Sequence, residues 1–289
     1  MHTNLIILAG GNSSRMKTAV THHHLSTAQL KEANTKSKGL ISIGKNGRPF
    51  LDFLLYNAQK AGYKNIFIVI GEQGDLFKAL YGRNTRNKNF KNLNIVFATQ
   101  YIPNNREKPL GTADAILQAV TQYPILKNES YTVCNSDNLY SYEALLALRN
   151  TSFPNAFISY DRDALLFSSE RIARFALTKL DLQNNLLAII EKPSLEDINN
   201  YKDAKGALRV SMNIFKFDGK IIYPYLKNCP LHPERNEKEI PMVLANMLTA
   251  NATKIVGIPF VEHVPDLTSK EDIAIVKEYI LKTFSFPNF

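Results

Sequence analysis

Mostly apolar short runs alternate with helix-like segments through the first half of the chain. The runs predict strands at residues 5–8, 66–70, 94–98 and 131–134. Between them, apolar residues recur every three or four positions, which predicts helices over 51–62, 76–81 and 112–123. A strand that is apolar at every position is typical of a parallel sheet buried on both faces. This half therefore predicts an α/β fold, a Rossmann-like and mostly parallel sheet with helices on both faces.

From about residue 155 the rhythm changes, because strand-like stretches follow one another with fewer helices between them. They lie at 156–160, 175–180, 187–191 and 208–217. The tail from 239 returns to a helix, a strand over 253–258 and a final helix over 270–283. The second half therefore predicts a smaller, antiparallel-leaning β-rich region laid over a cleft at the carboxyl ends of the first strands.

The length suits one large core, and no internal repeat is present in the 289 residues. We therefore expect a single domain over 1–289, made of a first part (about 1–150), a β-rich part (about 151–235) and a C-terminal return (236–289).

Composition favours a soluble enzyme with an anionic ligand. Hydrophobic residues make up 45%, charged residues 21%, and the formal net charge is +9. The basic residues are scattered rather than clustered, so we expect no nucleic-acid partner. Cys134 and Cys229 are the only cysteines, which excludes a disulfide framework and predicts reduced thiols. With no signal-peptide pattern and no long apolar span, the expectation is a cytoplasmic protein without membrane contact.

The first predicted strand runs directly into a glycine turn. Gly10 and Gly11 let the backbone pass close to a ligand, and the polar residues 12–14 leave backbone N–H groups for an anion. Arg15 then adds a fork of charged donors for phosphate oxygens. The pattern lacks the third glycine of the dinucleotide fingerprint and the Gly-Lys-Ser/Thr of the NTPase loop. It indicates phosphate binding, with an ordinary tight turn as the alternative.

A carboxylate follows the fourth predicted strand, at Asp137. The carboxyl ends of parallel strands share one edge of a sheet, so Asp137 and the glycine turn could meet in one cleft. A carboxylate beside a bound triphosphate calls for a cation, and Mg²⁺ takes one or two carboxylates together with phosphate oxygens. An aspartate at a strand end is also a common turn former or helix cap, and the residues alone leave both readings open.

The glycine turn resembles the signature loop of the sugar-1-phosphate nucleotidylyltransferases, the NDP-sugar pyrophosphorylases. Their pattern reads Leu-Ala-Gly-Gly-x-Gly/Ser-x-Arg-Met/Leu, and here Leu8, Ala9, Gly10 and Gly11 begin it. In that family a lysine follows and starts another apolar strand; residues 38–44 match it here. The resemblance implies an enzyme that joins an NTP to a sugar-1-phosphate, with Mg²⁺ as cofactor and Arg15 and Lys38 on the reacting phosphates.

Further segments match the family in the same order along the chain. Residues 110–115 (Leu-Gly-Thr-Ala-Asp-Ala) are similar to the segment that holds the base and ribose, particularly in ADP-glucose pyrophosphorylases. The resemblance assigns nucleotide binding to Gly111, Thr112 and Ala113, with Gln100 as the usual upstream glutamine. The alternative is a plain amphipathic helix capped by Thr112.

The sugar half and the metal site also have counterparts. In Glu191-Lys192-Pro193 the resemblance gives Glu191 to sugar hydroxyls and Lys192 to the sugar phosphate. Ser211 and Asn213 lie on the strand that matches the sugar pocket, and strand alternation places them on one side. The resemblance makes Asp137 one Mg²⁺ ligand and Asp266 the other. The alternative for residues 264–272 is a helix start capped by Thr268 or Ser269.

One insertion departs from the family pattern. Residues 17–37 separate the arginine from the matching lysine, and they contain three consecutive histidines that we read as a polar loop rather than a metal site. Lys17 therefore competes with Lys38 for the phosphate role. Two other functions stay open: a regulatory protein that binds nucleotide sugars without turnover, and cytidylyl transfer to a non-sugar phosphate. The base, the sugar and the oligomeric state are not fixed by the sequence, although similar enzymes are usually homo-oligomers.

Overall fold

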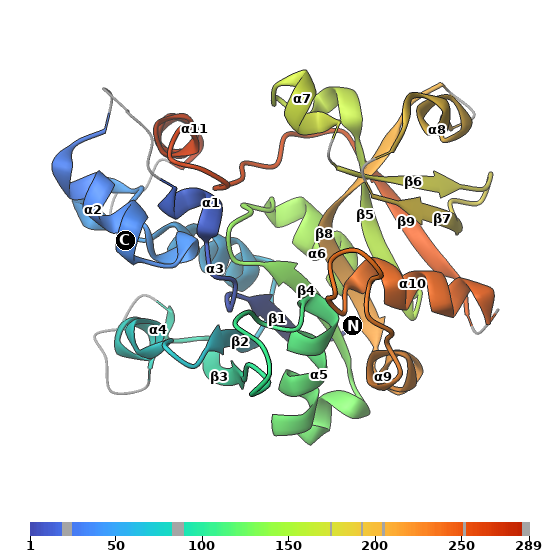
Figure 1. Ribbon diagram of the computed structural model, residues 1–289, viewed down its shortest axis with the longest axis horizontal. Helices are drawn as coiled ribbons and strands as arrows, with labels where there is room; N and C mark the ends of the chain where they lie inside the picture. The colour runs from blue at the N-terminus through green and yellow to red at the C-terminus, as the bar shows by residue number, and fades with distance from the viewer. Residues whose placement is uncertain are drawn as a thin grey trace.

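The computed structural model describes residues 1–18, 25–82, 90–173, 175–191, 193–203, 206–250 and 253–284. Its strands are β1 (Asn4–Leu8), β2 (Asn65–Gly71), β3 (Asn94–Gln100), β4 (Ser130–Asn135), β5 (Asn155–Asp161), β6 (Ala176–Leu180), β7 (Leu186–Ile190), β8 (Arg209–Asp218) and β9 (Ile255–Phe260). Its α-helices are α1 (Ser14–Lys17), α2 (Thr27–Thr35), α3 (Phe50–Lys60), α4 (Asp75–Tyr81), α5 (Thr112–Gln122), α6 (Tyr142–Asn150), α7 (Ser169–Ile172), α8 (Leu195–Asn200), α9 (Gly219–Lys227), α10 (Ile240–Thr249) and α11 (Asp272–Thr283). Figure 1 shows these helices arranged around the sheet.

The described strands form one sheet of nine strands, with the order β3-β2-β1-β4-β8-β5-β9 and with β6 and β7 branching from β8. Strands β1 to β4 are parallel to one another, as predicted. The β-rich region is not a separate sheet, because β8 pairs antiparallel with β4 on one side and with β5 on the other. Parallel pairing of β5 with β9 completes a mostly parallel, mixed α/β sheet.

Apolar side chains fill both faces of this sheet. In β1, Leu5 and Ile7 belong to the core that is covered by α3, α6 and α11, whereas Ile6 belongs to the core covered by α5, α9 and α10. Successive strand side chains point to opposite faces, so a strand with two buried faces needs an unbroken aliphatic run. The predicted helices on both faces are confirmed.

Two segments differ from the expectation. Residues 38–44, expected as a strand, instead begin with a 3₁₀ turn over Lys38–Leu40 and make only an isolated bridge between Ser42 and Pro49. This turn packs tightly across the strand ends, since a Cβ at Gly39 would lie 3.1 Å from the carbonyl oxygen of Ser136. Helices α6 and α9, which no prediction covered, pack one on each face of the sheet.

The insertion contains a helix. Helix α2 begins at a capping box, in which the Ser26 side chain accepts from Gln29 N–H and the Gln29 side chain accepts from Ser26 N–H. The three histidines at 22–24 lie outside the described residues. Within the part of the chain that the structure describes, no helix is long and apolar enough to span a membrane.

Candidate active site

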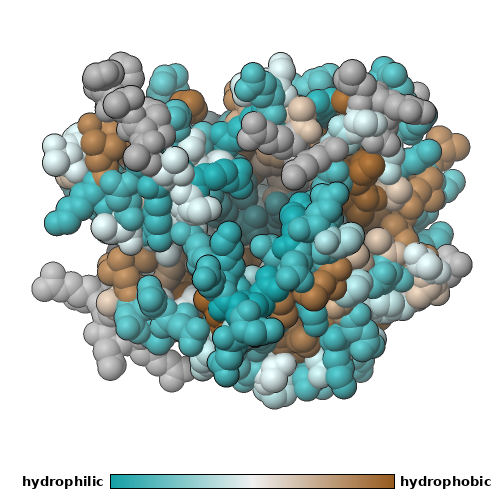
Figure 2. Space-filling view, in the orientation of Figure 1, coloured by the Kyte–Doolittle hydropathy of each residue, from teal (hydrophilic) through white to brown (hydrophobic). Residues whose placement is uncertain are grey.

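A pocket of about 420 Å³ lies at the carboxyl ends of β1, β3 and β4. Its wall includes the glycine turn with Arg15, the Lys38 turn and Asp137, as the sequence predicted for one cleft. Figure 2 shows a hollow in this face of the molecule, lined mainly by hydrophilic residues. The volume is in the range of pockets that hold small-molecule ligands.

The glycine turn brings the backbone close to neighbouring strands. A Cβ at Gly10 would lie 3.2 Å from Gln100 Oε1 and 3.4 Å from the backbone nitrogen of Gly71. Ala9 N–H donates to Val69 O at 2.8 Å, which ties the turn to β2. Leu8, Ala9, Gly10 and Gly11 all line the pocket, and so does Arg15, whose side chain is exposed on α1. The predicted phosphate loop therefore faces a cavity, with an arginine free to reach into it.

Of the two candidate phosphate lysines, Lys38 is the one that lines this cavity. Its Nζ donates to Asp137 Oδ2 at 2.9 Å, and the two side chains are 12% and 25% exposed. Lys17, the competing candidate, is exposed on α1 and lines neither of the pockets described here. The tight packing of the 3₁₀ turn on Ser136 explains how Lys38 reaches the residue that follows β4.

A polar network extends from Gln100 in the wall of the pocket to the first turns of α5. Gln100 Nε2 donates to Gly111 O at 3.0 Å and to Asp114 Oδ2 at 2.9 Å. Gln118 Nε2 donates to the same carboxylate oxygen at 2.8 Å, while Gln118 Oε1 accepts from Tyr101 N–H. Because the carboxylate only accepts, Gln100 keeps its amide nitrogen on this network.

The loop before α5 differs in detail from the expectation. Gly111, with φ +113°, holds the position before the helix, and Thr112 is the first helical residue rather than its cap. The Thr112 hydroxyl accepts from Ile240 N–H at 3.1 Å. Gly111 and Thr112 line the pocket, but Ala113 is fully buried behind it, with its N–H donated to Lys238 O.

A second pocket of about 850 Å³ adjoins the first. The predicted sugar residues Glu191, Ser211 and Asn213 line it. Strand alternation does not hold here, because the register of β8 against β5 shifts and Asn213 has φ +56°. The resulting bulge brings Met212 to the same wall as its two neighbours.

Glu191 is not free in this pocket, since its carboxylate forms an ion pair with Arg235. The same Arg235 nitrogen contacts Glu239 Oε2 at 2.5 Å. Burial, followed by the charge of Glu191, raises the pKa of the Glu239 carboxyl above its ordinary value. Lys192, predicted to bind the sugar phosphate, lies outside the described residues.

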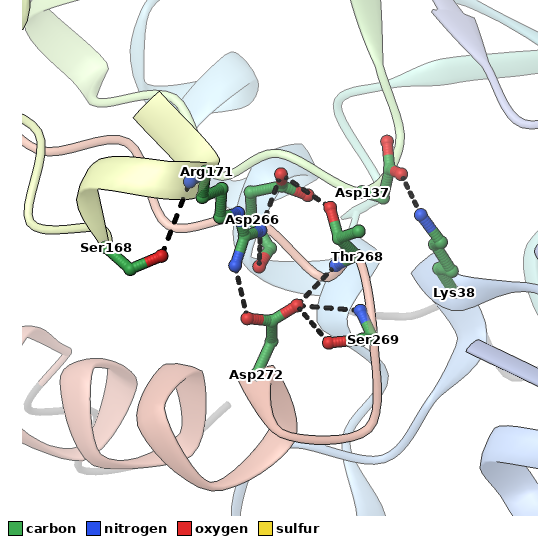
Figure 3. Close-up of polar contacts among 8 residues, drawn as sticks. All are labelled: Lys38, Asp137, Ser168, Arg171, Asp266, Thr268, Ser269 and Asp272. Atoms are coloured by element: carbon green, nitrogen blue, oxygen red, sulfur yellow. Dashed lines mark hydrogen bonds and ion pairs between the residues drawn. The ribbon is translucent and has the colours of Figure 1, made fainter. Parts of the chain in front are cut away.

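Asp266 lies beside Asp137, and its side chain is 12% exposed. Leu267 N–H donates to Asp137 O at 2.9 Å, which holds the two backbones together. Asp266 Oδ2 accepts from Arg171 Nη2 at 2.8 Å and from Thr268 Oγ1 at 2.9 Å (Figure 3). Burial and the charge of Asp137 raise the pKa of the Asp266 carboxyl, while Arg171 opposes that shift.

The helix cap expected from Thr268 or Ser269 is absent, and Asp272 instead accepts hydrogen bonds from both residues. Neither Thr268 nor Ser269 caps α11, which begins at Asp272. Instead, Asp272 Oδ2 accepts from the N–H groups of Thr268 and Ser269 at 2.8 and 2.7 Å. The carboxylate, rather than a hydroxyl, satisfies the turn that carries Asp266.

The two carboxylates fit a Mg²⁺ ion in their chemistry. Lys38 engages Oδ2 of Asp137, and Arg171 with Thr268 engages Oδ2 of Asp266, so each carboxylate keeps Oδ1 without a hydrogen-bond partner among the described residues. No group of three or more His, Cys, Asp or Glu suited to a metal exists among these residues. Mg²⁺ does not need one, because it binds through one or two carboxylates with phosphate oxygens and water.

Sequence reasoning missed Arg171, Arg235 and Asp114. Arg171 and Arg235 stand in segments without a recognisable motif, and each reaches carboxylates far away or in another loop. Asp114 was visible in the 110–115 segment, and its position in the first turn of α5 was the available signal. Its bond to Gln100 depends on the pairing of β3 with the rest of the sheet, which no local pattern specifies.

Most of this chain is similar to known proteins. Residues 4–256 match the family described as nucleotidyl transferase. The chain is 22% identical over 269 residues to the bifunctional protein GlmU of Staphylococcus haemolyticus, covering 92% of this chain and 49% of that protein. It is 23% identical over 252 residues to GlmU of Staphylococcus epidermidis, covering 86% and 46%. The chain thus spans about half the length of these curated relatives.

The fold also has a solved counterpart. A UDP-glucose pyrophosphorylase, crystallised with UDP-glucose, superposes with a TM-score of 0.71 at 17% sequence identity, covering 98% of this chain and all of that one. At this identity the likeness concerns the fold. The family match extends over most of the sequence and includes the glycine turn, Lys38 and Asp137. The chain therefore belongs to the nucleotidyl transferase family.

Proposed function

We propose that this protein is a sugar-1-phosphate nucleotidylyltransferase, which converts an NTP and a sugar-1-phosphate into an NDP-sugar and pyrophosphate. The observation that carries this proposal is the junction of the two pockets. Arg15, Lys38, Asn135 and Asp137 line both of them. Two cavities that share a cationic wall suit two substrates that react through their phosphates.

The orientation of the substrates follows from the chemistry of each end. Gly10, Gly11 and Gly111 have no side chain and leave room for a flat base. Gln100 offers its Oε1 there, because its Nε2 already donates to Gly111 O and Asp114 Oδ2. The triphosphate then points toward Arg15 and Lys38. The sugar lies in the second pocket, where Ser211, Asn213 and Glu191 offer hydrogen bonds to hydroxyl groups.

The reaction in this arrangement is an in-line displacement at the α-phosphorus. An oxygen of the sugar phosphate forms the new P–O bond while the bond to the β-phosphate oxygen breaks, and pyrophosphate leaves. Little proton transfer is needed, so catalysis rests on positioning and charge neutralisation. Arg15 holds the triphosphate and stabilises the departing pyrophosphate. Lys38 neutralises the reacting phosphates, and Lys192 orients the incoming sugar phosphate.

Asp137 and Asp266 are the residues that would hold Mg²⁺. When bound, the ion supplies charge neutralisation at the phosphate oxygens. Before any ligand arrives, Lys38 and Arg171 balance the two carboxylates.

The decisive experiment measures pyrophosphate release with Mg²⁺ over a matrix of nucleoside triphosphates and sugar-1-phosphates. Release that requires both partners is the expected result. An Asp137→Asn variant should abolish turnover with an unchanged thermal unfolding curve, because it removes one of the two carboxylate charges. Asp75→Asn is the matched control, since Asp75 is 88% exposed and its ion pair among the described residues is with Lys78.

Two outcomes would overturn the proposal. If no pair of substrates gives pyrophosphate release but a nucleotide sugar binds saturably, the result would favour a regulatory protein. Release with phosphocholine and CTP, but with no sugar phosphate, would favour cytidylyl transfer. Near-normal turnover of Asp137→Asn would refute the assignment of Asp137 as a metal ligand, but it would not bear on the proposed substrates.

A further inference from the structure

Arg171 joins a part of the β-rich region to the carboxylates at the centre of the site. It lies on α7, between β5 and β6, and its guanidinium crosses to the loop between β9 and α11. Nη2 donates to Asp266 Oδ2 at 2.8 Å and to Asp266 O at 3.2 Å. Nη1 donates to Asp272 Oδ1 at 2.5 Å. The planar fork therefore spans two carboxylates, which a lysine could not do with one point charge.

Aromatic rings hold the guanidinium from the other side. Its central carbon lies 4.3 Å from the centre of the Phe167 ring. Phe167 meets Phe175 and His263 edge to face, at 5.5 and 4.8 Å between ring centres. His263 in turn accepts from Leu166 N–H at 3.1 Å. Arg171 is thus fixed by a stacked ring and two carboxylates, rather than being a mobile surface side chain.

The orientation of Asp266 depends on this fixed group. Arg171 and Thr268 both donate to Oδ2, and Asp272 fixes the backbone of the turn that carries Thr268. Rotation of the Asp266 carboxylate would break both bonds to Oδ2. Figure 3 shows this cluster beside the Lys38–Asp137 pair. The oxygen left for a ligand is Oδ1, as it is in Asp137.

We infer that Arg171 is a positioning residue for the divalent cation, because it locks Oδ2 of Asp266 and so presents Oδ1 together with Oδ1 of Asp137. This inference rests on the proposed function, which requires a cation at these carboxylates. The opposite role would be an internal cation that blocks the metal and must be displaced. The contacts favour positioning, since Arg171 binds Oδ2 and the backbone oxygen and makes no hydrogen bond to Oδ1.

The test measures binding of Mn²⁺ alone, by electron paramagnetic resonance of the free ion, with the full chain, three test variants and one control variant. Arg171→Gln should weaken Mn²⁺ binding by about 10–100-fold, the usual effect of removing a group that orients a metal ligand. Arg171→Lys should recover only part of that loss, because it restores charge without the fork. Thr268→Val should give a smaller loss. Arg162→Gln, in the same segment but outside both pockets, is the control and should bind as the unmodified chain does.

The outcomes separate this inference from the proposed function. Equal or tighter Mn²⁺ binding by Arg171→Gln overturns the positioning role, and tighter binding assigns the blocking role instead. If Arg171→Gln does not fold, the order of affinities of Arg171→Lys and Thr268→Val decides, and unchanged affinity in both overturns the inference. Pyrophosphate release by the unmodified chain without measurable Mn²⁺ binding would overturn the inference and leave the transferase proposal in place.

Discussion

Substitution of Gly111 by alanine tests how the pocket wall before α5 is built. Gly111 has φ +113° and ψ −178°, a region that residues with a Cβ rarely adopt. A Cβ there would lie 2.3 Å from the carbonyl oxygen of Lys238 and 2.9 Å from its backbone nitrogen. Since these are backbone atoms, neither can move aside as a flexible side chain would.

The expected cost has two parts. Backbone strain in this region is of order 1–3 kcal/mol. Relief of the contact separates the 110–113 loop from Lys238 and breaks two hydrogen bonds, Ala113 N–H to Lys238 O and Lys238 N–H to Leu110 O. At about 0.5–1.5 kcal/mol for each bond, the total loss is about 2–6 kcal/mol. Such a loss is a large fraction of the roughly 5–15 kcal/mol that stabilises a typical domain.

Urea unfolding of Gly111→Ala and two controls measures this loss. Gly206→Ala places a Cβ at a position with a positive φ (+79°) and with no described neighbour within 4 Å, so it isolates backbone strain. Gly11→Ala has neither a positive φ nor a neighbour within 4 Å and should unfold as the unmodified chain does. A parallel thermal-shift titration with the preferred NTP should show weaker stabilisation of Gly111→Ala, because the loop lines the pocket.

A Gly111→Ala variant that loses no more stability than Gly206→Ala would refute the predicted cost of the contact with Lys238. That result would mean that the contact with Lys238 contributes nothing. A variant with the full stability loss and unchanged NTP binding would instead separate the loop from the nucleotide.

Two further predictions concern a histidine and an arginine. Burial, with Lys216 as the next cause, lowers the pKa of His2 from 6.5 to about 3, so the unfolded chain takes up a proton first as the pH falls. The protonation of His2 should therefore lower the free energy of unfolding by about 2–3 kcal/mol between pH 6.5 and 4.5. In urea unfolding, His2→Gln should lose less stability over this pH range than the unmodified chain. An identical loss in both chains would contradict the prediction. Arg15→Ala should raise the KM for NTP about tenfold or more, as expected for a lost charge-assisted contact with phosphate. The melting temperature should not change, because the Arg15 side chain is exposed. A rise confined to the KM for the sugar phosphate would contradict the role assigned to Arg15.

Elements with a strong local pattern could be predicted from the sequence. The aliphatic run of β1, the helical spacing of α5 and the glycine turn each depend on neighbours within a few residues. Strand-end residues such as Asp137 were also predictable, because parallel topology places them at one edge. The site residues that line the pockets come largely from such positions.

Features that depend on distant contacts were not predictable in this way. Lys38 was expected to start a strand, yet packing of Gly39 on Ser136 forms a tight turn instead. The bulge at Asn213 depends on the register between β8 and β5. The role of Arg171 depends on two aspartates about a hundred positions later in the chain. No periodicity encodes such pairs, because the loops between them set the approach.

The position of β8 has a consequence for how the chain acquires its structure during synthesis. Strand β4 leaves the ribosome with one edge unpaired, and its partner arrives only with Arg209–Asp218, so that Ser130 meets Asp218. Until then the backbone hydrogen-bonding groups of that edge are unpaired, and the apolar side chains of β4 are not covered on that side. Closing so long a loop is entropically costly and slows folding. We expect the part of the sheet formed by β1 to β4 to remain incomplete until most of the chain has been made. In that interval the nascent chain would need protection from association.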